Sequence, residues 1–228
     1  MSTLYDQLSQ IKEILLHQLK QHWTDVDEEI IDKALPAAAG AVERNFRGLP
    51  NRRFFSGGEV QFSPYMSVQW MIFLYRLSRE IYKDGGVDTP KEADQVYYLN
   101  KILHSNDWFY AIDLPTHFLC EHPLGSVLGR AQYDDHFFVY QGTTVGGNRI
   151  NGSLCYPVIG DNVIMFANST ILGNSHIGNN VVISAETYII NADIPDNCIV
   201  FGKSPNLVIK TKSEEEIKSY TQHIWGWI

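Results

Sequence analysis

Aliphatic residues that return every six positions are the feature that most constrains the fold of this chain. The run extends without a miss through Ile159, Met165, Ile171, Ile177, Ile183 and Ile189. An α-helix needs a period of about 3.6 residues and a half-buried β-strand a period of about two, so neither explains this run. Asn and Gly lie between the aliphatic positions, and both residue types tolerate the left-handed backbone of a tight corner. The pattern predicts a parallel β-solenoid with three short strands per coil and its aliphatic side chains pointing inward.

One polar segment breaks this rhythm. A weaker run with the same period precedes it, out of phase with the later one, at Val127, Tyr133, Val139 and Val145. The segment between the two runs, residues 146–157, is rich in polar and turn-forming residues. Solenoids usually place irregular insertions on a binding face. We therefore expect residues 146–157 to form a functional loop.

The first half of the chain has the periodicity of amphipathic helices instead. Apolar residues recur at three- and four-residue intervals, at Leu4, Leu8, Ile11, Leu15 and Leu19. Thr89, Pro90 and Glu92 have the spacing of a helix start with a capping box. The sequence thus predicts an α-helical domain over residues 1–115, used for packing or oligomerisation, followed by the solenoid over residues 116–209.

The end of the chain leaves the solenoid pattern. Ser213 and Glu216 have the spacing of a second capping box, which predicts a short last helix. We expect the tail, residues 210–228, to cover the open end of the solenoid, because repeat proteins need such caps.

Charge and cysteine content exclude several function classes. The chain has 228 residues with 18 Lys and Arg against 26 Asp and Glu, a net charge of −8, which argues against nucleic acid and anionic membranes as partners. The three cysteines are far apart, and no group of candidate ligands has the spacing of a metal site, so we expect no metal. The N-terminus lacks the apolar core of a signal peptide and no apolar run could span a bilayer, so a cytoplasmic location is expected.

A set of short motifs lies along the predicted solenoid, between about residues 119 and 209. They are His122-Pro123, Leu128-Gly129-Arg130, YQGTTVGG at residues 140–147, YPVIGDNV at 156–163, ILGN at 171–174 and IPDN at 194–197. Together they resemble the serine O-acetyltransferases, which belong to the left-handed β-helix, or hexapeptide-repeat, acyltransferases. The resemblance implies an α+β chain: an N-terminal α-helical domain, a left-handed parallel β-helix of hexapeptide repeats, and a short C-terminal helix.

The same resemblance implies the reaction and the assembly. Acetyl-CoA would be the acyl donor and the hydroxyl of L-serine the acceptor, with no covalent acyl-enzyme. The family forms homotrimers whose active sites lie between neighbouring subunits, and serine enzymes also pair two trimers through their helical domains. Members commonly end in Ile, which inserts into the active site of cysteine synthase, and this chain ends in Ile228.

Two histidines are candidates for the general base that takes the proton of the acceptor hydroxyl. Histidine suits this role because its ordinary pKa lies near 6.5. In the family, a coil with an Asp-His pair follows the His-Pro motif and supplies the base. Here the interval between His122 and Gln141 is shorter by roughly one coil, and the nearest local match is Asp134-Asp135-His136. The base is therefore either His122, with Glu121 beside it, or His136, held by Asp134 or Asp135.

The polar segment supplies further candidates. Gly146 and Gly147 end a strand where free N–H groups could stabilise an oxyanion, or they form only a turn. Asn148 and Arg149 follow them as candidates for binding the acceptor, and Arg149 could instead pair with a CoA phosphate. Tyr156 stands where the family has a substrate-side His, and either contributes its hydroxyl or only packs.

By resemblance, CoA contacts fall at Ala167 and Asn168, at Ala185 and near Lys203, where a cation could meet a phosphate. Three functions follow from these residues. The first is acetyl transfer to serine, and the second is acyl transfer to a sugar or another small metabolite, which the shortened interval and Tyr156 favour. The third is a non-catalytic β-helix that serves as a scaffold.

Overall fold

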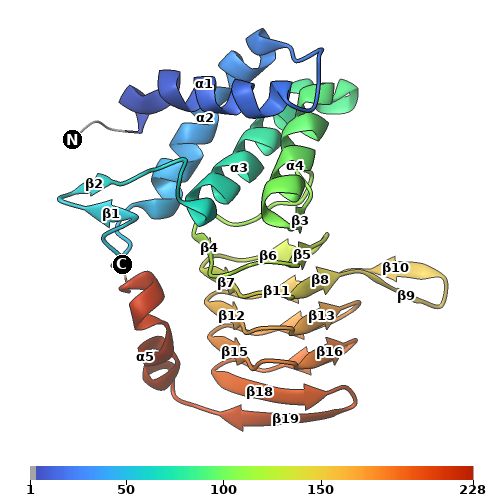
Figure 1. The fold of residues 1–228 in the computed structure, drawn as a ribbon. Coiled ribbons are helices and arrows are strands. Elements are labelled where there is room, and N and C mark those ends of the chain that lie inside the picture. Colours follow the sequence, from blue (N-terminus) through green and yellow to red (C-terminus); the bar gives the residue numbers. More distant parts are fainter. Residues whose placement is uncertain (1–3, 228) are drawn as a thin grey trace. The chain divides into compact units, whose positions relative to one another are not determined.

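The structure is a computed structural model that describes residues 4–227, apart from the side chain of Val87. Ile228, on which the expected contact with cysteine synthase depends, lies outside these residues. The chain divides into two compact units, one of residues 1–105 with 109–111 and the other of residues 106–108 with 112–228. Figure 1 labels most of their helices and strands. Among the described residues, no helix combines the length and the apolar character needed to cross a membrane.

The first unit is helical. Its elements are η1 (Tyr5–Gln7), α1 (Leu8–Lys20), α2 (Glu28–Phe46), β1 (Phe55–Ser56), β2 (Glu59–Val60), α3 (Ser67–Gly85), η2 (Gly86–Asp88) and α4 (Lys91–His104). Helix α3 packs against both α2 and α4. The apolar stripe of the N-terminal sequence is buried as predicted, at Leu4, Ile11, Leu15 and Leu19. The hydrophobic effect on these faces therefore holds the helices together.

One of the two predicted capping boxes is correct and the other is wrong. Helix α5 (Glu214–Trp225) begins with a full capping box between Ser213 and Glu216. Helix α4 begins after Pro90 and has no side-chain cap. The Glu92 carboxylate, almost fully buried, accepts a hydrogen bond from the main-chain N–H of Asp27 at 3.0 Å instead. A contact from outside its own helix thus replaces the local cap that the spacing suggested.

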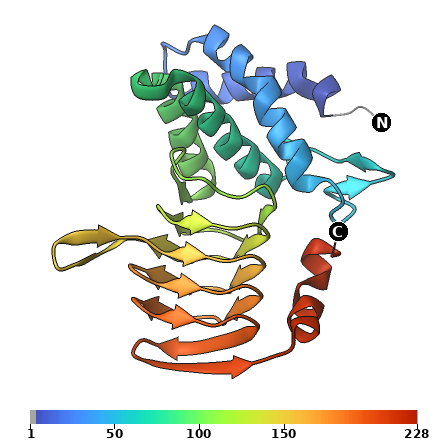
Figure 2. The same cartoon turned by 180° about the vertical axis from the view of Figure 1, so that it is seen from behind.

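The second unit is a parallel β-solenoid with three faces (Figures 1 and 2). Face A contains β4 (Phe118–Cys120), β7 (Phe137–Val139), β12 (Val163–Met165), β15 (Val181–Ile183) and the first half of β18 (Cys198–Lys203). Face B contains β3 (Asp107–Trp108), β5 (Val127–Leu128), β8 (Thr144–Gly146), β13 (Thr170–Leu172), β16 (Tyr188–Ile190) and Lys203 of β18. Face C contains β6 (Gln132–Tyr133), β11 (Val158–Ile159), β14 (His176–Ile177) and β17 (Asp193–Ile194). The solenoid strands therefore begin at Asp107, before the expected domain boundary at residue 116.

The six-residue rhythm is the core of this solenoid. Each aliphatic of the run is at most 3% exposed, and Met165 pairs in register with Ile183 one coil later. The small residues between them close the corners: the Ser169 hydroxyl donates to the carbonyl of Phe166 and the Ser175 hydroxyl to that of Leu172. The corner residues Asn162, Asn180 and Asn197 have positive φ angles, as the turn-former argument predicted.

Three edges join the faces, and each carries a stack of corner loops. The AB edge contains residues 121–126, 140–143, 166–169 and 184–187. The BC edge contains residues 129–131, 147–157, 173–175 and 191–192. The CA edge contains residues 134–136, 160–162, 178–180 and 195–197. Residues on one edge lie one strand spacing apart, about 4.8 Å, from coil to coil.

We expected the tail to cover the open end of the solenoid, and this was wrong. Its helix α5 lies along face A instead (Figure 1). Ile217 of α5 packs against Val182 and Ile199, which point outward from that face. The Trp225 ring reaches Phe138 of β7, with ring centroids 6.4 Å apart. Face A is apolar on its outer side at these positions, so burying it stabilises α5 there. Strand β19 (Asn206–Thr211) pairs antiparallel with β18 and ends the sheet.

Candidate active site

The AB edge gathers one candidate base and most of the expected CoA contacts. His122 lies in the first corner loop, Ala167 and Asn168 in the third, and Ala185 in the fourth. Main-chain hydrogen bonds link the loops, from Gly142 N–H to the Leu124 carbonyl and from Asn168 N–H to the Gln141 carbonyl, at 2.9 and 2.8 Å. Residues that are far apart in sequence therefore form one continuous strip.

The loop that carries His122 is longer than its neighbours, and the His122 side chain is exposed on this strip. Its corner loop is two residues longer than the next, because six positions separate Cys120 from Ser126 where four separate Val139 from Thr143. The His122 side chain is 80% exposed, and its Nε2 lies 3.9 Å from a carboxylate oxygen of Glu121. The imidazole is therefore open to a bound molecule and has an acid beside it.

Glu121 is anchored to the next coil. Its carboxylate accepts a hydrogen bond from the Tyr140 hydroxyl, and burial together with this bond raises the pKa of Tyr140 to about 12. The Tyr140 ring stacks on Phe166 of the following coil, with centroids 5.1 Å apart. This aromatic ladder fixes Glu121 in place next to His122.

The surface of the strip depends on a glycine. Gly142 has φ +64°, and a Cβ there would lie 2.1 Å from the Asn168 side-chain oxygen. The amide of Asn168 occupies the space that any other side chain at 142 would need. Lys203 belongs to face B, where it pairs in register with Tyr188 in the last coil, so it lies at the opposite end of the solenoid from His122.

The predicted functional loop is a β-hairpin on the BC edge. Strands β9 (Asn148–Ile150) and β10 (Ser153–Cys155) pair antiparallel and extend away from the stacked coils (Figures 1 and 2). Arg149 donates to the Gly152 carbonyl at 3.1 Å and is exposed. Gly146 and Gly147 lead into the hairpin. These residues are on the far side of face B from His122, so the described chain alone does not bring them to the same site.

Tyr156 packs at the base of the hairpin. A Cβ at Gly147 would lie 2.9 Å from the Tyr156 ring, and the Arg130 guanidinium stands 5.5 Å from the centroid of that ring. The Tyr156 side chain therefore holds the hairpin onto the solenoid through a glycine contact and a cation–π contact.

The second candidate base, His136, lies on the CA edge and has an unexpected partner. Its Nδ1 is 2.9 Å from an Asp161 carboxylate oxygen in the next coil. Asp135 binds His117 of the preceding coil instead, with its carboxylate 2.6 Å from His117 Nδ1 and 2.7 Å from His117 N–H. No described contact joins Asp134 to His136. The expected pairing of His136 with Asp134 or Asp135 is therefore corrected to Asp161.

His117 was missed by sequence reasoning. It lies eighteen residues before Asp135, which is one coil, but residues 113–126 lack the six-residue rhythm that would assign it to a coil. Its ring is parallel to that of His136, with centroids 4.8 Å apart. The Trp225 and Trp227 rings lie 5.3 and 6.2 Å from the His136 ring, so the C-terminal segment covers this histidine.

The two acid–histidine pairs on the CA edge alter ionisation. The hydrogen bond to Asp161 raises the pKa of His136 above its ordinary value of 6.5, against the opposing effect of partial burial. Burial would raise the pKa of Asp135, but hydrogen bonds from the ring and N–H of His117 outweigh it and lower that pKa to about 2. The contact with Asp161 thus favours the protonated form of His136, and the contacts with His117 favour the ionised form of Asp135.

These shifts predict a pH-dependent contribution to stability. Because the pKa of His136 is raised in the folded state, its pairing stabilises fully below about pH 6.5 and the gain is lost as the pH rises through the folded pKa. We expect the melting temperature of His136→Asn to fall below that of the wild type by more at about pH 5.5 than at about pH 8.5. Thermal unfolding of both proteins at the two pH values, with a chelator present, measures the melting temperatures. A difference in melting temperature that does not vary with pH would contradict the prediction.

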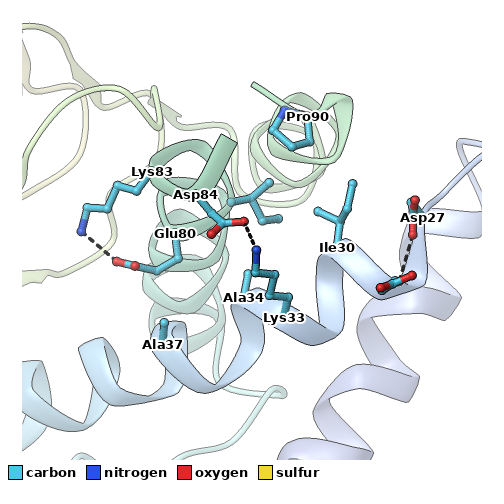
Figure 3. Close-up of a pocket in the computed structure, with 11 residues that line it drawn as sticks. Asp27, Ile30, Lys33, Ala34, Ala37, Glu80, Lys83, Asp84 and Pro90 are labelled. Carbon is cyan, nitrogen blue, oxygen red and sulfur yellow. Dashed lines mark hydrogen bonds and ion pairs between the residues drawn. The ribbon is translucent and has the colours of Figure 1, made fainter. Parts of the chain in front are cut away.

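A cavity of about 620 Å³ in the helical unit contains none of the predicted site residues. It lies between α2 and α3 and is shown in Figure 3. Its two lysines are engaged within the wall, Lys33 with Asp84 at 2.7 Å and Lys83 with Glu80 at 2.9 Å. Both lysines of this cavity are therefore held in ion pairs.

Comparisons with known proteins agree with the motifs. No family model matches the chain. The serine acetyltransferase of Synechococcus elongatus is 36% identical over 83 residues, which are 36% of this chain and 34% of that protein. That of Staphylococcus epidermidis is 34% identical over 101 residues, which are 44% of this chain and 46% of that protein. The matches thus span from about a third to just under half of these curated relatives.

Solved structures extend the likeness in fold. A Brucella abortus serine acetyltransferase in complex with coenzyme A aligns with a TM-score of 0.67 at 19% identity, over 93% of this chain and 83% of that one. A Neisseria gonorrhoeae serine acetyltransferase in complex with serine aligns with a TM-score of 0.58 at 25% identity, over 80% of this chain and 73% of that one. The resemblance seen in the motifs is confirmed: this chain is similar to the serine acetyltransferases in sequence over the matched residues and in fold over most of its length.

Proposed function

We propose that the chain is an acetyl-CoA-dependent O-acetyltransferase that acts on L-serine or a similar small hydroxyl compound. The observation that carries this proposal is the AB edge, where an exposed acid–histidine pair lies on the same strip as Ala167, Asn168 and Ala185. The likeness to serine acetyltransferases, including one in complex with coenzyme A and one in complex with serine, supports the same reaction.

His122 is the general base in this proposal. Its imidazole takes the proton of the acceptor hydroxyl, whose oxygen attacks the acetyl carbonyl directly, without an acyl-enzyme. The tetrahedral intermediate then expels the CoA thiolate, which receives that proton from the imidazolium and leaves as the thiol. Glu121, 3.9 Å from His122 Nε2, stabilises the imidazolium that forms between the two transfers. His136 fits this role less well, because Asp161, Trp225 and Trp227 surround it.

Assigning the base to His122 also removes an apparent deletion. The interval to Gln141 is short only if His122-Pro123 is matched to the His-Pro motif of the family. Glu121 and His122 can instead be matched to the Asp-His pair of the family, which lies one coil after the His-Pro motif. They form an acid–histidine pair on a corner of the solenoid, as that match requires. On this reading no coil is missing from the chain.

The AB edge also suits an extended donor. The five strands of face A, from β4 beside His122 to β18, are separated by four spacings of about 4.8 Å, which make about 19 Å. The pantetheine arm would lie along the small residues Ala167 and Ala185, with the thioester near His122. Lys203, exposed at the far end, would meet a phosphate of CoA.

We propose a homotrimer because the expected groups lie on two edges of one chain. Arg149, Asn148 and the N–H groups of Gly146 and Gly147 belong to the BC edge, across face B from His122. A neighbouring subunit that presents its BC edge to the AB edge would bring them together, with the glycine N–H groups at the oxyanion and Arg149 at the acceptor. Two trimers could pair further through their helical units.

We expect the protein in the cytoplasm, since Cys120, Cys155 and Cys198 are free thiols.

A thiol-release assay with acetyl-CoA tests the function. We expect release that depends on L-serine and saturates with both substrates. A panel of sugars and other small hydroxyl compounds is assayed in parallel. A different acceptor is the second candidate, because Tyr156, which packs on Gly147, stands where the resemblance implies a substrate-side His. Turnover only with a member of that panel would replace serine by it. The absence of both turnover and CoA binding in calorimetry would refute the enzyme and leave the scaffold.

A further inference from the structure

Three metal-ligating side chains converge on the CA edge outside the proposed active site. One ligand atom each of His117, Asp135 and His136 lies within 4.8 Å of the others. The two imidazole rings are parallel, with an angle of 3° between their planes. Against the expectation from the sequence that there is no metal, we propose that this set, here called the CA cluster, binds a divalent transition-metal ion of the zinc type.

The ligand chemistry of the CA cluster supports this. Two imidazoles and one carboxylate leave one coordination position open, which is a set that zinc and its neighbours accept. Asp161 holds His136 through Nδ1 at 2.9 Å and so leaves Nε2 to face an ion. A carboxylate behind a ligating imidazole orients the ring and increases its basicity.

The side chains can reach the required geometry. Tetrahedral zinc with ligands at about 2.0–2.1 Å places neighbouring ligand atoms about 3.3 Å apart. The CA cluster must therefore contract from its present separations by rotation of its side chains. An ion can reach the cluster, because the side chains of His117, Asp135 and His136 are 26%, 38% and 23% exposed.

The local charge also favours a cation. Asp135 and Asp161 contribute two negative charges. Lys218 of α5 is the positive group that acts on Asp161, and it is itself paired with Glu214. With both histidines neutral, the site is net negative.

The chain contains a matched control. His176 Nδ1 lies 2.9 Å from an Asp193 carboxylate oxygen on the same solenoid. This pair matches the contact of His136 with Asp161 but has no second imidazole among its described contacts. The fold also offers a conservative variant, because Asn162, Asn180 and Asn197 occupy the corner position of His136 in later coils, with the same positive φ. His136→Asn therefore removes a ligand while keeping a side chain suited to the corner.

The test is a titration of the metal-free, full-length protein with Zn²⁺ at about pH 7.5 by calorimetry. A second titration with Ni²⁺ follows tryptophan fluorescence, because Trp225 lies 5.3 Å from the His136 ring and a paramagnetic ion there quenches it. We expect one ion per chain. His117→Ala and His136→Asn should weaken binding by more than about 100-fold and Asp161→Asn by about 10–100-fold, with His176→Ala unchanged.

Three results would overturn the proposal: no saturable Zn²⁺ binding, binding that survives both His117→Ala and His136→Asn, or an equal loss in His176→Ala. Circular dichroism of each variant shows that the solenoid is folded, and Asp161→Asn serves if either histidine variant fails to fold. The outcome is independent of acetyl transfer, since the readouts are heat and fluorescence.

Discussion

His122→Ala is expected to lower kcat for acetyl transfer by about 10²–10⁴-fold at saturating acetyl-CoA, the usual contribution of a positioned general base. The His122 side chain is exposed and carries no core packing, so the loss should come from proton transfer and leave stability unchanged. Steady-state thiol release against both substrates measures it. A fall in kcat and in kcat/KM by the same factor would mark an interaction made in the transition state.

Two variants make this result decisive. His176→Ala, an exposed histidine on face C, should keep the wild-type kcat. If His136→Asn loses activity while His122→Ala keeps it, the base is on the CA edge and the assignment to His122 is wrong. His122→Ala should also keep the wild-type mass in solution, which we expect to equal three chains of 26.0 kDa, so that a broken assembly cannot explain the loss.

Trp225→Ala is expected to lower the free energy of unfolding by about 3–5 kcal/mol, the range for removing a fully buried aromatic side chain. Trp225 has no exposed surface and contacts the rings of His136 and Phe138. Its loss leaves a cavity between α5 and face A. Urea denaturation followed by circular dichroism measures the change.

Tyr220→Ala is the control on the same helix. Tyr220 is 50% exposed, and exposed substitutions of this kind change the free energy of unfolding by less than about 0.5 kcal/mol. Equal, small effects of the two variants would show that α5 does not hold face A through Trp225. The position of α5 along that face would then need revision.

Much of the fold could be predicted because the solenoid repeats one physical requirement. Each coil must present an aliphatic side chain to the same interior. The spacing of Ile159, Ile171 and Ile183 therefore predicts the solenoid without any knowledge of contacts. The corner residues are equally local, since a positive φ at Asn162 or Asn180 favours the same residue type in every coil.

The candidate site was only partly predictable. Ala167, Asn168 and Ala185 were expected from the resemblance, and the fold places them on one edge with His122. The partner of His136 was wrong, because sequence reasoning looked to its neighbours Asp134 and Asp135. In a solenoid the closer neighbour of a corner residue is the one in the next coil, here Asp161.

The course of the tail was beyond local signals. The spacing of Ser213 and Glu216 predicted where α5 begins. They carry no information on what the helix packs against, which depends on the outward-facing Val182 and Ile199. Those residues look like ordinary strand residues in the sequence, because nothing local distinguishes an apolar side chain that points outward from one that points inward.

By itself, the sequence therefore determined the helical and solenoid halves, the corner positions and the break at residues 146–157, because these follow from periodicity and backbone preference. Only the tertiary structure decided which edge each histidine occupies, that His117 joins His136, and that the hairpin lies across face B from His122. The physical reason is that strand stacking brings residues one coil apart to about 4.8 Å, while successive corners along the chain point in different directions.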